Sequence, residues 1–359
     1  MSATVYPGLQ ATLAGFIDPV IGRDLISAGV VSRAELAGAR AIVAIELGFP
    51  AAGHAPGLKA AITERIRLDT GLEAEVSITW RVKPHAVQKN LRPLAQIRNV
   101  IAVASGKGGV GKSTVAVNLA LALQAEGARV GLLDADIYGP SQPRMLGSSA
   151  RPSSPDGKIM NPVVAHGLQS MSIGYLIDDT QPTIWRGPMV TSALMQLLTE
   201  TRWDDLDYLI IDMPPGTGDI ALTLSQKIPL SGAVIVTTPQ DIALLDARKG
   251  LEMFRKVEVT VLGVVENMSV FCCPNCGHQS AIFGSGGGDK LAFETGVDVL
   301  GRLPLDGRIR EQADNGRPTV VSDPDSDAAK AYRDIALRAA ARLAHGEVNA
   351  FPSLSISDD

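Results

Sequence analysis

The feature that most constrains this chain is a glycine-rich segment, Ser105–Thr114, with the sequence SGKGGVGKST. It contains the pattern G-x-x-x-x-G-K-[ST], in which backbone N–H groups turn inward around a polyphosphate. Side chains at the glycine positions would block that approach. Lys112 can neutralise the terminal phosphates, and Ser113 can offer its hydroxyl to Mg²⁺. The segment therefore predicts a nucleotide triphosphatase that uses ATP and Mg²⁺.

The flanking residues supply the context that this motif requires. Ile97–Ala104 is a short apolar run rich in β-branched residues, which predicts a buried strand. Val115–Glu126 carries Val, Leu and Ala at helical spacing and is followed by Gly127, a residue suited to a helix C-terminus. Strand, loop and helix thus follow in the required order. This order disfavours the alternative of a glycine-rich turn that binds nothing.

Carboxylates follow two further apolar runs. Val130–Leu133 leads into Asp134 and Asp136, and Tyr208–Ile211 leads into Asp212. A carboxylate directly after a buried strand can hold a metal-bound water beside a phosphate loop. Taken singly, each aspartate is better explained as a turn or helix-cap residue. Together with the glycine-rich loop, they predict the remainder of an ATP site.

Bulk properties limit the classes of partner. The 359 residues are 45% hydrophobic, which is enough for one large core and a smaller domain. The net charge is −5, with no run of Lys or Arg, so we expect no nucleic-acid partner. No stretch approaches the roughly 20 apolar residues that span a bilayer, and Met1–Gln10 lacks a signal-peptide pattern, so we expect no membrane partner. Three cysteines, an odd count, favour a reducing, cytoplasmic location.

The chain divides into four segments. We expect a small α+β domain over residues 1–83, a linker over 84–96, a P-loop ATPase domain over 97–346 and a disordered tail over 347–359. In the first domain the pattern predicts two helices and two strands: Leu9–Ile17, Pro56–Asp69, Ala41–Leu47 and Glu75–Val82.

From residue 97 onward, apolar strands alternate with helical stretches. This alternation predicts an α/β fold with a mostly parallel sheet flanked by helices on both faces. A second glycine cluster, Gly284–Gly288, lacks the lysine and the strand of a phosphate site, so we expect a flexible loop there. After the first strand, the expected strands are Val130–Asp134, Leu209–Asp212, Ala233–Thr238, Val261–Val265 and Val299–Leu303.

The cysteines form a possible metal site. Cys273 and Cys276 have the C-x-x-C spacing that lets two thiolates converge on one metal centre. Two thiolates complete neither a tetrahedral zinc site nor an iron–sulfur cluster, so the count favours a site shared by two chains. Zinc fits this number as well as iron–sulfur does, and a redox pair or inert cysteines are further alternatives. We expect Cys272 to be a spare thiol and His278 a solvated loop residue.

These motifs in combination resemble a known family. The loop with its second lysine, Lys107, is similar to that of the MinD/ParA class of dimeric ATPases. The first domain more weakly resembles the small assembly-factor domain often fused ahead of such ATPases, a likeness carried by Asp18–Val31. Four further segments narrow the resemblance to the Mrp/ApbC group of iron–sulfur cluster carrier ATPases, over about Ile97 to His345: Asp134–Ser141, Trp185–Met189, Asp212–Asp219, and Glu266–Ser269 with its C-x-x-C.

The resemblance implies roles for individual residues around the nucleotide. Lys107 would reach across a dimer interface to the partner's nucleotide, and Asp136 would position the attacking water. Lys107, Lys112 and Asp136 are therefore the expected catalytic residues. Asp134 and Asp212 would support the Mg²⁺ shell with Ser113. The expected nucleotide-binding residues are Gly106, Lys107, Gly108, Gly109, Val110, Gly111, Lys112, Ser113, Thr114 and Asn267, the last of them near the adenine.

The same resemblance implies that Cys273 and Cys276 bridge a [4Fe–4S] cluster with the partner chain's pair. The first domain has no cysteine before Cys272, so it cannot supply a thiolate to a cluster. The expected protein is thus a homodimeric ATPase that transfers a cluster to apo iron–sulfur proteins.

Two rival functions stay open at this point. A positioning ATPase would need a basic surface or an amphipathic membrane helix, but Ala328–Leu343 is better explained as a helix packed on the sheet. A P-loop ATPase with a structural zinc knuckle is the second rival.

Overall fold

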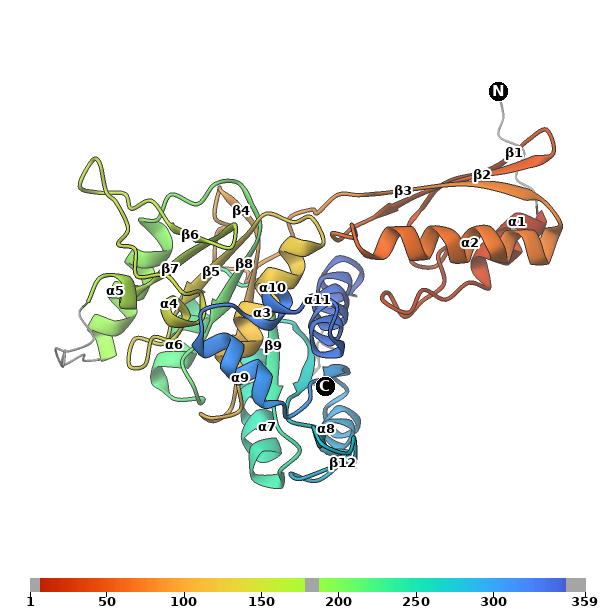
Figure 1. Cartoon of the computed structure of the whole chain (residues 1–359). Helices are drawn as coiled ribbons and strands as arrows, with labels where there is room; N and C mark the ends of the chain where they lie inside the picture. Colours follow the sequence, from red (N-terminus) through yellow and green to blue (C-terminus); the bar gives the residue numbers. More distant parts are fainter. Residues whose placement is uncertain (1–6, 178–186, 347–359) are drawn as a thin grey trace, which may run out of the picture.

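The computed structural model describes residues 7–177 and 187–346, which form two domains side by side (Figure 1). The N-terminal domain has a three-stranded sheet in the order β1-β2-β3, with α2 along one face (Figure 1). β1 and β2 pair antiparallel, whereas β2 and β3 are parallel strands joined by the α2 crossover. The elements of this domain are α1 (Pro7–Ala14), β1 (Val31–Ala37), β2 (Arg40–Leu47), α2 (His54–Thr70) and β3 (Glu73–Trp80).

The patterning of the N-terminal domain explains its two layers. Every second residue of β2 is buried, so one face of the strand lies on the core. The buried residues of α2 are Leu58, Ile62 and Ile66, which recur at helical spacing and face the same core. By contrast, most of β1 is at least partly exposed, as expected of an edge strand.

The large domain is built on an eight-stranded sheet in the order β13-β10-β9-β4-β8-β5-β7-β6. All its strand pairs are parallel except the antiparallel β6–β7 hairpin. This confirms the predicted α/β class with a mostly parallel sheet. The strands are β4 (Ile97–Ala104), β5 (Val130–Asp134), β6 (Val163–Ala165), β7 (Leu168–Ser172), β8 (Leu206–Asp212), β9 (Gly232–Thr237), β10 (Val261–Glu266) and β13 (Val299–Arg302).

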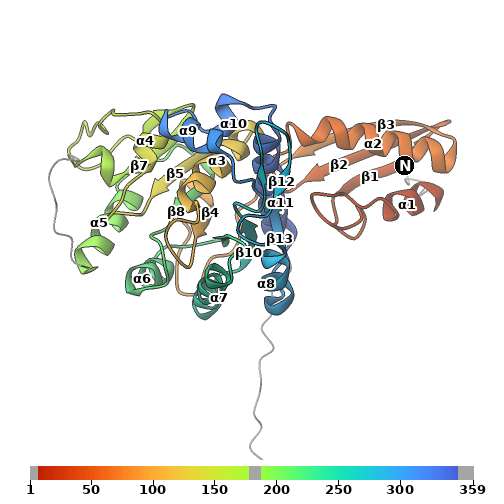
Figure 2. The same cartoon turned by 60° about the horizontal axis from the view of Figure 1, so that its bottom comes forward.

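Helices cover both faces of this sheet (Figure 2). α3 and α11 pack together on one face, and the apolar residues of α5, α6 and α7 form a second core on the other. α11 therefore packs on the sheet as predicted for this segment. The helices are α3 (Lys112–Ala125), α4 (Gln142–Met145), α5 (Gly187–Thr199), α6 (Asp219–Lys227), α7 (Asp241–Lys256), α8 (Gly287–Thr295), α9 (Gly307–Asp314), α10 (Thr319–Ser322) and α11 (Asp327–His345).

The domain junction lies at the C-terminal ends of α3 and α11. Glu126, the residue that follows α3, is buried and accepts the backbone N–H of Ala52 on its carbonyl at 3.0 Å. Phe49 meets His345 at the end of α11 edge-on, with ring centroids 6.0 Å apart. The core on the α3 face is therefore continuous with the core of the N-terminal domain.

The connection between the domains forms no helix or strand over residues 81–96, but it is attached to the large domain. The Gln88 side chain is buried, where its Nε2 donates to the carbonyl of Ser225 at 2.8 Å. Its Oε1 accepts the backbone N–H of Leu230 at 3.0 Å. This single polar side chain ties the connection to the region between α6 and β9.

Some expected elements differ from the structure. The first helix ends at Ala14 and not at Ile17, because Gly15 and the turn around Asp18 follow it. The hairpin of β6 and β7 was not predicted, since its strands are only three and five residues long. Its two-residue turn, His166-Gly167, has positive φ at both positions, as type I′ turns require.

The second glycine cluster was wrongly expected to be a loop throughout. Gly287 and Gly288 are buried in the first turn of α8. A Cβ on Gly287 would lie 2.7 Å from the carbonyl oxygen of Pro239, so only glycine allows this close packing. The tail at 347–359 and residues Trp185 and Arg186 of the family motif lie outside the described residues.

Candidate functional site

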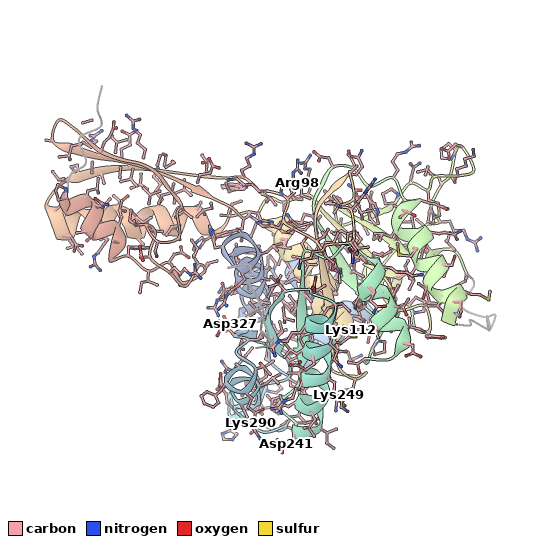
Figure 3. The ribbon with its side chains drawn as sticks, turned by 180° about the vertical axis from the view of Figure 1, so that it is seen from behind. Arg98, Lys112, Asp241, Lys249, Lys290 and Asp327 are labelled. Atoms are coloured by element: carbon pink, nitrogen blue, oxygen red, sulfur yellow. The ribbon has the colours of Figure 1, made fainter. Side chains whose placement is uncertain are left out.

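The parallel register brings the predicted site residues to one edge of the sheet. The glycine-rich loop leaves the carboxyl end of β4, which lies next to β8, and β8 lies next to β5. Asp212 pairs in register with Val103 of β4 and with Asp134 of β5. Carboxyl ends of parallel strands meet where open α/β sheets bind their ligands. Figure 3 shows Lys112 within the body of this domain, away from the rim residues Asp241 and Lys290.

The glycines of the loop fall into two groups. A Cβ on Gly106 would lie 2.1 Å from the backbone of Asp246 in α7, and one on Gly111 would lie 2.2 Å from Nδ2 of Asn267. These two glycines let the loop pack closely on the protein itself. Gly108 and Gly109 instead have open space, with nothing nearer than Pro215 Cβ at 4.0 Å. The open side of the loop can therefore admit a ligand close to its backbone.

The N-terminus of α3 is directed at this open side. Its N-cap, Gly111, has φ 84° and no side chain that could cap the helix. The first N–H groups of an α-helix have no partner within the helix, and its dipole favours negative charge there. Loop and helix end together fit a phosphate group.

Lys112 is buried against the carboxylate of Asp212. Its Nζ donates to Asp212 Oδ1 and, at 3.1 Å, to the hydroxyl of Ser113. Only 6% of the Lys112 side chain is exposed, and Asp212 is not exposed at all. A buried charge needs a partner of this kind, because removing either member leaves the other desolvated. Lys112 therefore has an acidic partner within the chain.

Asp134 lies in the same buried cluster and accepts several hydrogen bonds. Its Oδ2 accepts the backbone N–H groups of Ser141 and Gln142 at 3.0 and 3.1 Å and the hydroxyl of Ser172 at 3.0 Å. Burial, and then the neighbouring Asp212 carboxylate, raise the pKa of Asp134 to about 7. When both are ionised, the buried carboxylates of Asp134 and Asp212 repel each other. A cation between them would relieve that repulsion.

Asp136 and Lys107 lie at the edge of the cluster. Asp136 is half-buried, and its backbone N–H donates to Asp134 Oδ1 at 3.2 Å. Burial has the largest effect on the Asp136 carboxyl group, and it raises the pKa of that group. Lys107 is also half-buried, and its Nζ donates to Oε1 of Gln240 at 3.5 Å, a weak contact. Neither side chain is committed to a strong interaction within the chain.

Asn267 lies under the loop in this structure. Its Nδ2 donates to the carbonyl of Val110 at 2.8 Å, and its Oδ1 accepts the backbone N–H of Met268 at 2.9 Å. The side chain is buried against Gly111. The Asn267 side chain thus holds the glycine-rich loop in place at Val110. The expected contact of Asn267 with adenine stays a prediction.

The cysteines lie on a separate, exposed hairpin of β11 (Phe271–Cys272) and β12 (Gln279–Ser280). Cys273 and Cys276 are joined by a tight turn in which the N–H of Gly277 donates to the carbonyl of Cys273 at 2.9 Å. Backbone N–H groups of Asn275 and Cys276, and then the Cys276 thiol, lower the pKa of the Cys273 thiol. The turn therefore favours the thiolate, the form that binds metal.

Within residues 7–177 and 187–346, no group of three or more His, Cys, Asp or Glu side chains could hold a metal ion. The cysteine pair is thus an incomplete site within the described part of one chain. Cys272 is exposed, and its Sγ donates to the carbonyl of Gly277 at 3.6 Å. His278 is exposed as predicted.

Oxygen ligands for a hard cation are present beside the loop. Ser113, Asp134 and Asp212 are the oxygen-bearing groups that Mg²⁺ prefers. Two further buried oxygens, Ser141 Oγ and Gln142 Oε1, find no hydrogen-bond partner among the described residues. Orphaned polar atoms of this kind fit a site that is completed by a hydrated ion.

Sequence reasoning missed Gln142, Ser172 and Gln240. Gln142 and Ser172 hydrogen-bond the aspartates of the cluster, and Gln240 contacts Lys107. Ser172 and Gln240 carry no local pattern that marks them. Gln142 directly follows the family motif Asp134–Ser141, and that proximity was the one available signal.

Fold and site together define a P-loop nucleotide triphosphatase: a glycine-rich loop between a parallel strand and an uncapped helix, beside strand-end carboxylates. A ParA family model described as NUBPL iron-transfer P-loop NTPase matches residues 96–340. The chain therefore belongs to this family, which confirms the resemblance inferred from the motifs. A second model, described as an iron–sulfur cluster assembly protein, matches residues 9–79.

Individual relatives agree with this assignment. An iron–sulfur cluster carrier protein of Escherichia coli (strain K12) is 52% identical over 342 residues, covering 93% of this chain and 91% of that one. One from Pseudomonas fragi is 61% identical over 272 residues, covering 75% and 95%. A solved nucleotide-binding protein from Archaeoglobus fulgidus in complex with ADP is 38% identical, with TM-score 0.57, covering 65% of this chain and 90% of that one.

No helix within the described ranges is both long and apolar enough to span a bilayer.

Proposed function

We propose that this protein is an ATP-hydrolysing iron–sulfur cluster carrier, which binds a cluster between two copies of the chain and transfers it to apoproteins. The observation that carries the proposal is the exposed Cys273–Cys276 turn, whose backbone N–H groups favour a thiolate. It is the half-site of a sulfur-ligated centre on a domain that also has a nucleotide site. The names of the curated relatives support the same activity.

In the nucleotide site, binding of ATP would move the Lys112 ammonium group from Asp212 to a phosphate. In the structure its ammonium group pairs with Asp212. A terminal phosphate on the open side of the loop would compete for that ammonium group, because it carries more charge and has the uncapped end of α3 behind it. Binding of ATP would therefore release Asp212 from Lys112. This exchange gives Asp212, the last residue of β8, a way to respond to nucleotide.

Mg²⁺ would be held by Ser113 and by the carboxylates of Asp134 and Asp212, and it would neutralise charge on the phosphates. The carboxylate of Asp136 is suited to orient the attacking water, since its side chain is half-buried and accepts backbone N–H groups of Gly139, at 3.3 Å, and of Tyr138 at the edge of the cluster. Asn267 would contact the adenine after its bond to Val110 loosens.

Lys107 supplies the link to a second copy of the chain. Among the residues that the structure describes, its ammonium group contacts Oε1 of Gln240 at 3.5 Å, so little is lost when it moves away. Reaching a phosphate across a dimer interface would place both nucleotides on the contact between the chains. Hydrolysis would then weaken the contact that brings the two cysteine turns together.

The cluster is the cargo of this cycle. Two chains with one Cys273–Cys276 pair each supply four thiolates, the usual ligand number of a [4Fe–4S] cluster. A cluster held by two chains is exposed to an acceptor whenever the dimer contact changes. Transfer then needs no further thiolate from the N-terminal domain, which has no cysteine.

The test is anaerobic reconstitution followed by transfer to an apo-ferredoxin. Wild type should bind about four iron and four sulfide ions per dimer and lose them faster to the acceptor when ATP is present. Cys273→Ser and Cys276→Ser should each bind less than about a tenth of that iron, whereas Cys272→Ser should match wild type.

Three results would contradict the proposal. The first is unchanged iron content in both turn variants. The second is a transfer rate that does not depend on nucleotide. The third is stoichiometric zinc in the purified protein that iron and sulfide cannot replace, which would instead support a structural zinc knuckle.

A further inference from the structure

Gln142 is a buried polar residue at the centre of the nucleotide site. It is the first residue of the short helix α4, and only 1% of it is exposed. Glutamine is rarely buried so completely unless its amide group is used. Its neighbours show what the amide group contacts.

Three hydrogen bonds join Gln142 to the three expected metal-binding positions. Its backbone N–H donates to Asp134 Oδ2 at 3.1 Å. Its Nε2 donates to Asp212 Oδ2 at 2.8 Å and to the backbone carbonyl of Ser113 at 3.1 Å. The orientation of the amide follows from these partners, because a rotated amide would place Oε1 against a carboxylate and a carbonyl.

The two oxygens of Asp212 therefore have different partners. Oδ1 accepts from Lys112, and Oδ2 accepts from Gln142. If Lys112 turns to a phosphate, the bond from Gln142 is the one that still fixes the plane of the Asp212 carboxylate. The freed Oδ1 would then be oriented and available to a cation.

The other half of the amide has no partner. Gln142 Oε1 is buried and makes no hydrogen bond among the described residues. The hydroxyl of Ser141, the preceding residue, is likewise buried and makes none with them. An aliphatic side chain would avoid this cost in a purely structural site. A glutamine here makes physical sense if a ligand supplies the missing donor.

We propose that Gln142 is a positioning residue for the metal–nucleotide complex: it holds Asp212 when Lys112 leaves, and its free oxygen is an acceptor for a water of the hydrated cation. This inference rests on the proposed function, since it requires Mg²⁺ and nucleotide at this loop. It predicts that replacing Gln142 reduces the factor by which Mg²⁺ tightens nucleotide binding. The affinity for nucleotide without Mg²⁺ should change little.

The experiment measures ADP affinity by titration calorimetry, once with excess Mg²⁺ and once with EDTA, on the full chain. Gln142→Met and Gln142→Leu remove the amide at similar volume. Gln124→Leu is the matched control, because Gln124 also has an unpartnered Oε1 but lies at the far end of α3, where its Nε2 donates to the carbonyl of His166.

For wild type and Gln124→Leu, Mg²⁺ should tighten ADP binding by the same factor. In the Gln142 variants that factor should fall about tenfold, while affinity in EDTA stays within about twofold. An unchanged Mg²⁺ factor in either folded variant overturns the inference, as does an equal loss of affinity with and without Mg²⁺. Absence of ADP binding by wild type would instead refute the proposed function itself.

Discussion

Glu126 caps the helix that begins after Gly53, although the two residues belong to different domains. The Glu126 carboxylate accepts the backbone N–H of Gly53 at 2.7 Å and that of His54 at 3.2 Å. α2 has no side-chain cap of its own at Gly53, and Glu126 is almost completely buried. The ATPase domain therefore completes the first turn of a helix in the N-terminal domain, where a negative charge also complements the helix dipole.

Removing this carboxylate should loosen the domain junction. In Glu126→Ala, two partly buried N–H groups at the start of α2 lose their acceptor, and loss of such a helix cap should cost about 0.5–2 kcal/mol. Hydrogen exchange of the first turn of α2 should speed up, and the melting temperature should fall. Glu64→Ala is the control, because Glu64 lies on the exposed face of the same helix and pairs only with Arg67. Equal exchange at α2 in the two variants would show that Glu126 is not a cap.

Loss of the Lys112 ammonium group should abolish nucleotide turnover. Lys112→Met removes the cation that would bind the terminal phosphates and leaves the buried Asp212 carboxylate without its ion pair. We expect ATP hydrolysis to fall at least about 100-fold, the size typical of losing one preorganised charge-stabilising donor. Lys249→Met, on the exposed face of α7, should keep the wild-type rate. A phosphate-release assay measures both, and comparable rates would exclude the assigned role of Lys112.

Lys107 should act on hydrolysis more than on nucleotide binding. Its weak contact with Gln240 contributes little within one chain, so Lys107→Ala should fold and bind ADP about as well as wild type. If the residue reaches the partner's nucleotide, ATP-dependent dimerisation and hydrolysis should both fall, by about tenfold or more. Lys290→Ala, exposed on α8, is the control. A normal ATP-induced dimer in Lys107→Ala, seen by light scattering, would contradict the cross-interface role.

The raised pKa of Asp134 makes a prediction about stability and pH. Burial and Asp212 raise this pKa to about 7 from an ordinary value of 3.8, so the native state binds a proton more tightly than the unfolded chain. The protonated form is favoured in the native state, and the stability that it contributes is lost as pH rises through about 7. The free energy of unfolding without Mg²⁺ should therefore fall between pH 5 and pH 8.

Asp134→Asn should flatten this pH dependence, because the neutral amide does not ionise. Asp156→Asn is the control, since Asp156 is exposed in a turn where backbone N–H groups of Ile159 and Lys158 lower its pKa, well below this window. Urea denaturation at the two pH values measures the difference. A slope in Asp134→Asn as steep as that of wild type would place the titrating group elsewhere.

Local sequence patterns were sufficient for the loop and its strands. The segment from Ile97 to Glu126 combines a buried strand, a glycine-rich loop with phosphate-binding spacing and an apolar, largely buried helix, all of which can be recognised from residues that are neighbours in the chain. Asp134 and Asp212 were found for the same reason, because each directly follows an apolar run. What each of these aspartates contacts could not be predicted from the sequence.

The parts that sequence reasoning missed depend on residues far apart in the chain. Gln142 contacts Asp212 across 70 positions, and Glu126 contacts Gly53 across 73. Neither side chain belongs to a periodic pattern, so only the folded sheet and the docked domain reveal its partner. The β6–β7 hairpin was missed because strands of three and five residues are too short to show a periodic pattern.

The central claim is that two chains together hold one iron–sulfur cluster. Native mass spectrometry of the anaerobically reconstituted protein tests this claim most directly. The account predicts a species with two chains and one [4Fe–4S] cluster, together with a cluster-free monomer for Cys276→Ser. A single chain that retains a complete cluster, or a Cys276→Ser dimer that still carries one, would contradict it.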